Sequence, residues 1–177
     1  YGSFSPSFLN KAADDAKNRR SVLSYLRGEQ KDGSANRKDC DFCSVIALEI
    51  EDTGTHIITC IGIAFEVRKS DSEIKKFVYF SHSGKMPESE YLTEQGVCYS
   101  NQEIKKLVSA RTKSDDNRGK GEVNRIYGSK EAYLGTLYDV ILGYIDQNRF
   151  ITMEKSAIAL KMTNGTGQFI RDYMFPK

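Results

Sequence analysis

The stretch from Val123 to Asn148 constrains the fold of this chain more than any other, because its apolar residues recur with a helical period. Successive members are separated by two, three, one, three, one and three residues, which traces one face of a helix. Ser129 can cap its start, and Glu131 then lies in the first turn, where the helix dipole favours a carboxylate. We therefore predict one long buried helix over 123–148, with these residues facing the core: Ala132, Leu134, Leu137, Tyr138, Ile141, Leu142 and Ile145.

Composition and length fit one folded domain. The chain has 177 residues, of which 39% are hydrophobic, and we assign residues 1–6 to a ragged terminus and residues 7–177 to a single domain. The net charge of +2 does not by itself imply a nucleic-acid partner. The longest strand-like apolar run, Ile57–Val67, is too short to span a membrane, so we expect no membrane partner. The chain neither begins with Met nor carries a signal peptide, and we expect a fragment of a longer protein.

Before the predicted long helix, the pattern favours one helix, then three strands. Helical spacing covers Ser7–Arg27, and runs rich in Val, Ile and Leu predict strands over Phe42–Ile50 and His56–Arg68. The turn signal Glu51-Asp52-Thr53-Gly54 between these two strands predicts an antiparallel hairpin. Further elements are predicted as follows: a strand over Phe77–Phe80, one helical turn over Ser89–Leu92, a helix over Asn101–Ala110, a strand over Ser156–Met162 and a helix over Gly167–Met174.

Two stretches resemble the nucleic-acid and nucleotide deaminase superfamily, and most closely its divergent bacterial toxin-type members. The segment Arg125–Leu134 resembles the helix on which that family carries a metal-ligating residue, one intervening residue and a glutamate. Tyr79–Gly84, with the two strands before it, resembles the hairpin and the glycine-bearing turn of those toxins. The resemblance implies a three-layer deaminase-like sandwich of α/β class. In it, a mixed sheet of four to five strands would pack against a long central helix and flanking helices.

The chain departs from that family at the metal site. Glu131 matches the general acid and base, but Ser129 stands at the first ligand position. Thr163–Gly167 stands where the family has two cysteines. A deaminase zinc needs histidine or aspartate together with two thiolates, whereas serine, threonine and asparagine are poor zinc ligands. We therefore expect no zinc at this helix start and no other cofactor.

The four cysteines offer two further chemistries. Cys40 and Cys43 form a Cys-x-x-Cys pair that can bind zinc together with His82, Cys60 or Cys98, although a second matched pair is missing. Alternatively, Cys43 and His82 can act as nucleophile and base of a thiol-dependent amidase or deamidase, if their strands bring them together. Reduced thiols in a cytoplasmic protein are the simplest interpretation, and we expect a cytoplasmic location. The cytoplasm in question can also be that of a host or target cell into which the protein is delivered.

A basic, glycine-rich segment precedes the predicted long helix. Basic residues and an aromatic side chain near one another can hold a nucleic-acid backbone, although neighbouring carboxylates offset part of this charge. The candidate binding residues are Arg111, Arg118, Lys120, Arg125 and Tyr127.

Three functional hypotheses follow. The first is a deaminase-fold domain of toxin or effector type that lacks the zinc centre and acts by binding a nucleic acid or a protein. The second is the thiol enzyme that uses Cys43 and His82, and the third is a non-catalytic structural interaction module. Ser129 and Glu131 remain candidate catalytic residues on the family resemblance alone.

Overall fold

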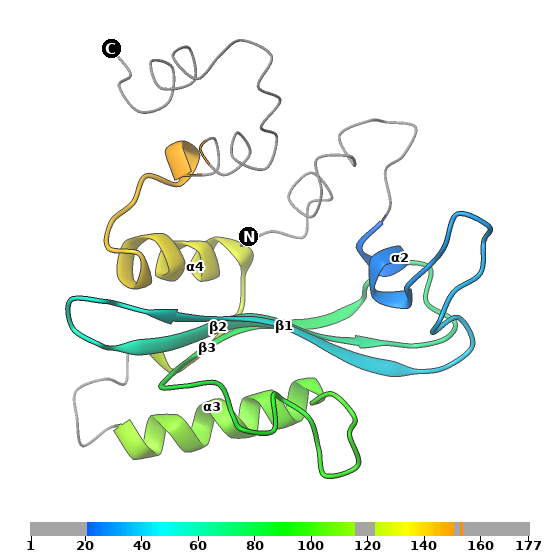
Figure 1. The fold of residues 1–177 in the computed structure, drawn as a ribbon, viewed down its shortest axis with the longest axis horizontal. Helices are drawn as coiled ribbons and strands as arrows, with labels where there is room; N and C mark the ends of the chain where they lie inside the picture. Colours follow the sequence, from blue (N-terminus) through cyan, green and yellow to red (C-terminus); the bar gives the residue numbers. More distant parts are fainter. Residues whose placement is uncertain (1–20, 116–122, 151–152, 154–177) are drawn as a thin grey trace.

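A computed structural model describes residues 21–115, 123–150 and 153 of the chain. Its centre is a four-stranded antiparallel sheet in the order β1-β2-β3-β4. Helix α3 covers one face, and α2 and α4 lie on the other, so the fold is an α/β sandwich of three layers (Figure 1). The strands are β1 Phe42–Glu51, β2 Ile58–Val67, β3 Lys76–Ser83 and β4 Arg125–Tyr127; the helices are α2 Val22–Arg27, α3 Asn101–Asp115, α4 Lys130–Gly135 and the π-helix η4 Thr136–Ile141.

The predicted hairpin is confirmed, with β1 and β2 paired from Phe42 opposite Val67 to Glu51 opposite Ile58. Its turn is organised by Asp52, whose carboxylate accepts hydrogen bonds from the backbone N–H groups of Gly54 and Thr55 at 2.8 and 3.1 Å. Aspartate favours turns because its side chain can bond the backbone two residues ahead.

Side chains of alternating parity divide the sheet into two cores. On the α3 face, Ala64 and Phe80 pack against Ile104 and Val108 of the helix. Gly62 lies beneath this layer, where an added Cβ atom would come within 2.7 Å of the Phe80 ring. The close packing of Phe80 therefore requires glycine at this position.

The opposite face is filled mainly by aromatic and large aliphatic side chains. Tyr79 and Tyr127 project from the sheet toward Tyr133 and Leu137 of the helical layer, and all four are buried. The rings of Tyr79 and Tyr133 stack with centroids 4.6 Å apart. Offset stacking of this kind adds about 1 kcal/mol beyond the burial of area.

The single helix predicted over 123–148 is wrong. Arg125–Tyr127 instead forms β4, because Tyr127 pairs with Tyr79 and buries its ring in the core. Ser129 then caps α4 by accepting from the N–H of Ala132 at 3.2 Å. The helical run ends at the π-helix η4, since Gly143 and Tyr144 adopt left-handed backbone angles of +74° and +62°. Leu134, Leu137 and Tyr138 face the core, as the periodicity predicted, whereas Ala132 and Ile145 are exposed, contrary to the prediction.

The other predicted elements have mixed outcomes. Ser21 has an extended backbone and caps α2, so a helix begins at Val22 and does not run unbroken from Ser7. Helix α3 continues five residues past Ala110. All strand pairs between described residues are antiparallel, whereas a mixed sheet was predicted. Four predictions fall outside the described residues: the terminus 1–6, the helical segment 7–20, the strand Ser156–Met162 and the helix Gly167–Met174.

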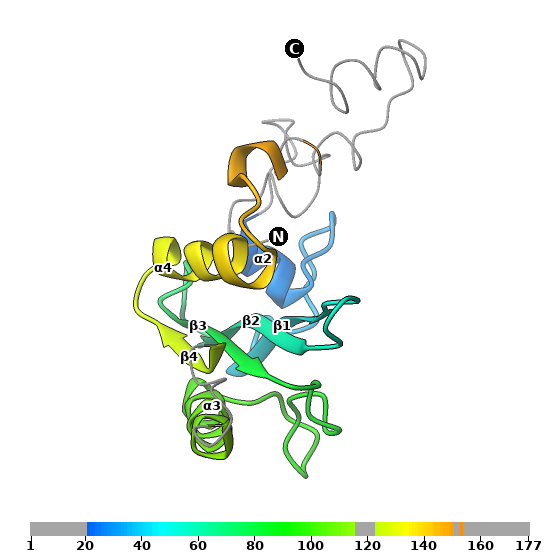
Figure 2. The same ribbon diagram turned by 90° about the vertical axis from the view of Figure 1, so that its left-hand side faces the viewer.

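Strand β1 forms one edge of the sheet, and helices α3 and α4 lie toward the other edge. Helix α3 packs against β2, β3 and β4, and α4 packs against β3 and β4. Figure 2 shows the sheet from its side, with α3 below the β3–β4 side and β1 displaced away from it. No helix within the described ranges is long and apolar enough to cross a membrane.

Candidate functional site

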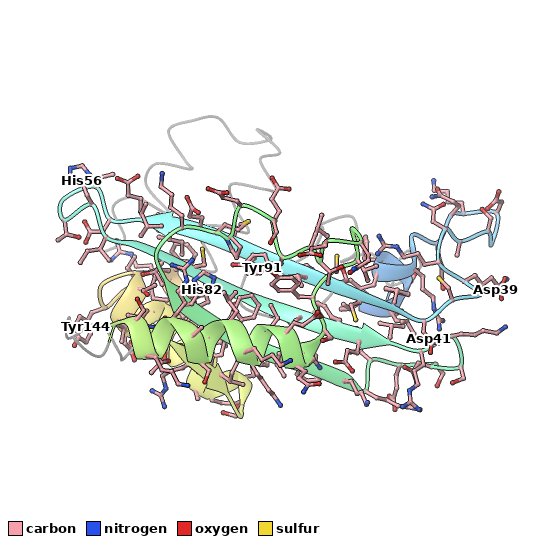
Figure 3. The ribbon with its side chains drawn as sticks, turned by 90° about the horizontal axis from the view of Figure 1, so that it is seen from below. Asp39, Asp41, His56, His82, Tyr91 and Tyr144 are labelled. Atoms are coloured by element: carbon pink, nitrogen blue, oxygen red, sulfur yellow. The ribbon has the colours of Figure 1, made fainter. Side chains whose placement is uncertain are left out.

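His82 lies near the end of β3 and is completely buried on the α3 side of the sheet (Figure 3). Its Nδ1 atom lies 3.0 Å from the carbonyl oxygen of Ser83, and its Nε2 atom lies 2.8 Å from the hydroxyl oxygen of Tyr91. A carbonyl oxygen can only accept, so Nδ1 carries the proton and Nε2 accepts from Tyr91. Both ring nitrogens are therefore occupied inside the protein.

Cys60 lies directly opposite His82 in the pairing of β2 with β3, and it is also fully buried. Its thiol donates to the carbonyl oxygen of Gly84, with sulfur and oxygen 3.5 Å apart. We call Cys60, His82 and Tyr91 the His82 cluster.

The electrostatics of the His82 cluster oppose thiol catalysis. Burial raises the pKa of the Cys60 thiol and lowers the pKa of His82. An activated cysteine needs the opposite shifts, because the thiolate is the nucleophile and a neighbouring cation stabilises it. The cluster is neutral and sealed from solvent, so its chemistry is that of a buried hydrogen-bond network.

The structure does not bring Cys43 and His82 together. Their partners on β2 are Glu66 and Cys60, six residues apart, which is about 20 Å at about 3.3 Å per residue. Figure 3 shows Asp41, two residues before Cys43, at the far end of the sheet from His82. Burial and the nearby charges of Glu66 and Glu103 raise the pKa of the Cys43 thiol, which disfavours a thiolate there.

Tyr91 is held in the core by an unusual backbone. Glu90 and Tyr91 both have left-handed φ angles, of +51° and +60°, where one helical turn was predicted. Residues other than glycine rarely adopt left-handed backbone angles, and they keep such angles where surrounding contacts hold them in place. Here the fixing contacts are the Tyr91 hydroxyl on His82 and the N–H of Tyr99, which donates to the Tyr91 carbonyl at 2.8 Å.

The start of α4 offers a cap and an exposed carboxylate. Ser129 serves as the N-cap, and Glu131 lies in the first turn with an exposed side chain. Burial, and then the charge of Glu131, raise the pKa of Tyr79 to about 12. Among the described residues, no three or more His, Cys, Asp or Glu side chains are gathered so that they could hold a metal ion.

The predicted basic surface is divided between the two faces of the sheet. Arg111 lies on α3, where its guanidinium contacts the carbonyl oxygen of Lys85 at 3.4 Å. Arg125 lies on the α4 side, with its guanidinium 5.8 Å from the centroid of the Tyr127 ring. Tyr127 itself is buried, and its hydroxyl bonds Ser81 at 2.6 Å. Arg118 and Lys120 lie outside the described residues.

A groove of about 660 Å³ separates α3 from the loop that follows β3. Its lining contains both apolar and charged side chains, and none of its titratable residues is buried. The main lining residues are Leu92, Tyr99, Glu103, Lys106, Leu107 and Ala110.

The remaining candidate is the outer edge of the sheet, which we call the β1 edge (Phe42–Glu51). Within the part of the chain that the structure describes, β1 pairs with β2 alone. Along its ten residues, alternate N–H and C=O groups therefore point outward without a strand partner. Ile46 and Leu48 are 47% and 44% exposed. Natural sheets block their edges with charged side chains, above all Lys, and with Pro. The strand contains no Lys, Arg or Pro, and its two charged residues, Glu49 and Glu51, lie at its end.

Comparison with protein-family models, with curated proteins and with solved structures finds no match for this chain. The geometry of the chain itself therefore carries the functional argument. Sequence reasoning named His82 and Cys43 but missed the His82 cluster and the β1 edge. The one signal for the edge was a long strand-like run without basic residues or proline.

Proposed function

We propose that this chain is a non-catalytic interaction module that binds protein by adding a strand to the β1 edge. The single observation that carries the proposal is a ten-residue edge strand with exposed Ile46 and Leu48 and without Lys, Arg or Pro. In strand addition, main-chain hydrogen bonds supply affinity, and alternate side chains supply specificity.

The family resemblance belongs to the same proposal. We infer a deaminase-like sandwich of toxin or effector type that acts in a cytoplasm without a zinc centre. Helices on both faces of the sheet, and a helix opened by Ser129 and Glu131, support this inference. All four cysteines are free thiols, which suits a reducing compartment.

A protein partner is favoured over a nucleic acid. The end of β1 carries Glu49 and Glu51, with Asp52 following, and carboxylates repel phosphates. Arg111 and Arg125 lie on opposite faces of the sheet and cannot follow one phosphate backbone together.

Fluorescence anisotropy with defined probes tests this proposal. The probe is a labelled ten-residue peptide of alternating valine and lysine; the controls are a valine–glutamate peptide of equal length and an oligothymidine. The valine–lysine peptide should bind with a Kd of about 10–100 µM, and the two controls should bind at least about tenfold more weakly.

Two variants locate the binding site. Ile46→Lys places a charge on the β1 edge and should weaken peptide binding by at least about tenfold. Val140→Lys makes the same kind of change at another exposed apolar position, 57% exposed on η4, and should leave binding unchanged. Binding of the oligothymidine in place of the peptide, or equal effects of the two variants, would contradict the proposal.

A further inference from the structure

We infer that the partner at the β1 edge is a second copy of this chain, paired antiparallel with β1 about a two-fold axis through Ala47. This inference rests on the proposed function of the β1 edge. It names the occupant of that site, which strand addition by itself leaves open.

The alternation of side chains limits where the axis can lie. Residues directly opposite each other in a sheet project to the same face, so the two-fold axis must pass through a residue and not between two residues. An axis through Ala47 pairs Leu48 with Ile46 of the second copy, and Ile46 with Leu48 of the second copy. The two exposed apolar side chains of each β1 edge then cover one another.

Charge distinguishes this register from its neighbours. An axis through Ile46 would set Glu51 opposite Asp41 of the second copy, and like charges directly opposite are destabilising. An axis through Leu48 would set Glu49 diagonally beside Glu49 of the second copy. With the axis through Ala47, Glu49 faces Val45 and Glu51 faces Cys43 of the second copy, so no carboxylate faces another.

The same register brings opposite charges together at the strand ends. The guanidinium of Arg37 lies over the Phe42 ring, 5.2 Å from its centroid, at the beginning of β1. Phe42 would lie opposite Asp52 of the second copy, which follows the end of β1. Each end of the paired strands therefore joins a cation from one copy to a carboxylate from the other.

The backbone supports a flat continuation of the sheet. β1 is paired with β2 over its whole length without a skipped residue, so the ladder contains no bulge to twist the edge away. On the α3 face, the small Ala47 would meet Ala47 of the second copy. Val45 and Ala47 already pack against the core on that face. Two four-stranded sheets would join as one.

Disulfide trapping tests the register directly. In a background of Cys40→Ser, Cys43→Ser and Cys98→Ser, the variant Ala47→Cys places two thiols opposite each other across the axis. It should form a covalent dimer on mild oxidation at least about tenfold faster than Glu49→Cys, whose two thiols lie well beyond disulfide reach. Faster trapping of Glu49→Cys would overturn the assigned axis.

Sedimentation of the complete chain tests the partner. The unsubstituted protein should shift from monomer to dimer between about 1 and 200 µM, and Ile46→Lys should raise the dissociation constant at least about tenfold. Val140→Lys should dissociate like the unsubstituted protein. A dimer that is insensitive to Ile46→Lys would overturn the inference, because copies would then meet elsewhere.

The peptide assay separates this inference from the proposed function. A chain that stays monomeric to about 200 µM and still binds the valine–lysine peptide would overturn the second copy as partner while the proposed strand addition stands. A monomer that binds no peptide would overturn both. A dimer that is weakened by Ile46→Lys, and that binds the peptide only after it has dissociated, would support both.

Discussion

The His82 cluster, built from β2, β3 and the loop after β3, contrasts with the β1 edge in both chemistry and accessibility. The cluster contains a thiol, an imidazole and a phenol, which are reactive groups, yet all are buried and bonded to one another or to the backbone. The β1 edge contains ordinary apolar and acidic side chains, yet its backbone is open. In this chain the reactive residue types are buried in a hydrogen-bonded core, and the plain strand is the surface that we propose for binding.

The largest effect on stability should come from His82→Ala. The change leaves a cavity and removes the acceptor of the buried Tyr91 hydroxyl, so the free energy of unfolding should fall by about 3 kcal/mol. Urea unfolding measures this change. His56→Ala is the matched control, because His56 lies on the exposed hairpin turn and its loss should cost no more than about 0.5 kcal/mol. Equal losses for the two histidines would remove the distinction between cluster and surface.

A smaller loss is expected for Tyr91→Phe, which keeps the ring and removes one hydroxyl. His82 Nε2 would then be buried without a donor, and the free energy of unfolding should fall by about 1–2 kcal/mol. Tyr144→Phe removes a hydroxyl from a side chain that is 87% exposed and should have no measurable effect. A neutral result for Tyr91→Phe would show that the cluster is held by packing alone.

The acid sensitivity of the fold should sharpen the comparison further. Burial is the main cause that lowers the pKa of His82; Arg111 lowers it further, while the Ser83 carbonyl and Glu49 raise it. The Tyr91 hydroxyl also faces the ring, and Cys60 lies opposite His82 on β2. Below about pH 6.5, the histidine of the unfolded chain therefore binds a proton, whereas His82 of the folded chain stays neutral until the pH falls further.

The His82 contribution to stability is thus complete above pH 6.5 and is lost as the pH falls below it toward the folded pKa. Thermal unfolding from about pH 7 to 5.5 should show this decline, and His82→Gln should flatten it. Asp52 and Glu103, whose pKa values are lowered by hydrogen bonds, lose their contributions at lower pH. An identical slope in the His82→Gln variant would assign the decline to another group.

The smallest effect should come from Glu131→Gln. Glu131 is exposed in the first turn of α4, where the dipole interaction of a carboxylate is worth no more than about 1 kcal/mol. Peptide binding at the β1 edge should be unchanged. If Glu131 transferred protons, an activity would exist and would fall by about 100-fold or more with an unchanged melting temperature, which would overturn the non-catalytic proposal.

Local patterns predicted the hairpin well because its information is local. Two runs rich in Val, Ile and Leu, and the Asp52 turn between them, suffice to define β1 and β2. The region 123–148 failed because its apolar spacing suits a helix, whereas Tyr127 is fixed by Tyr79, a residue far away in the sequence. A short edge strand that exists through one distant pairing leaves no periodic signal of its own.

The site was harder to predict for the same reason. Cys43 and His82 were paired on residue type, and only the register of three strands reveals that His82 meets Cys60 instead. Tyr91 reaches His82 through two left-handed residues, Glu90 and Tyr91, that no propensity scale favours. The β1 edge depends on strand order, which a single strand sequence does not contain.

The shortness of β4 decides what kind of assembly this sheet can enter. Among the described strands, the edge opposite β1 is β4, which has only three residues. In a dimer joined through β1, each long edge strand would be paired with the other by the two-fold contact. The short β4 of each copy would then form the two outer edges of the combined sheet. Growth would then stop at two subunits, and a protein with a ten-residue edge strand would be protected from polymerising into fibres.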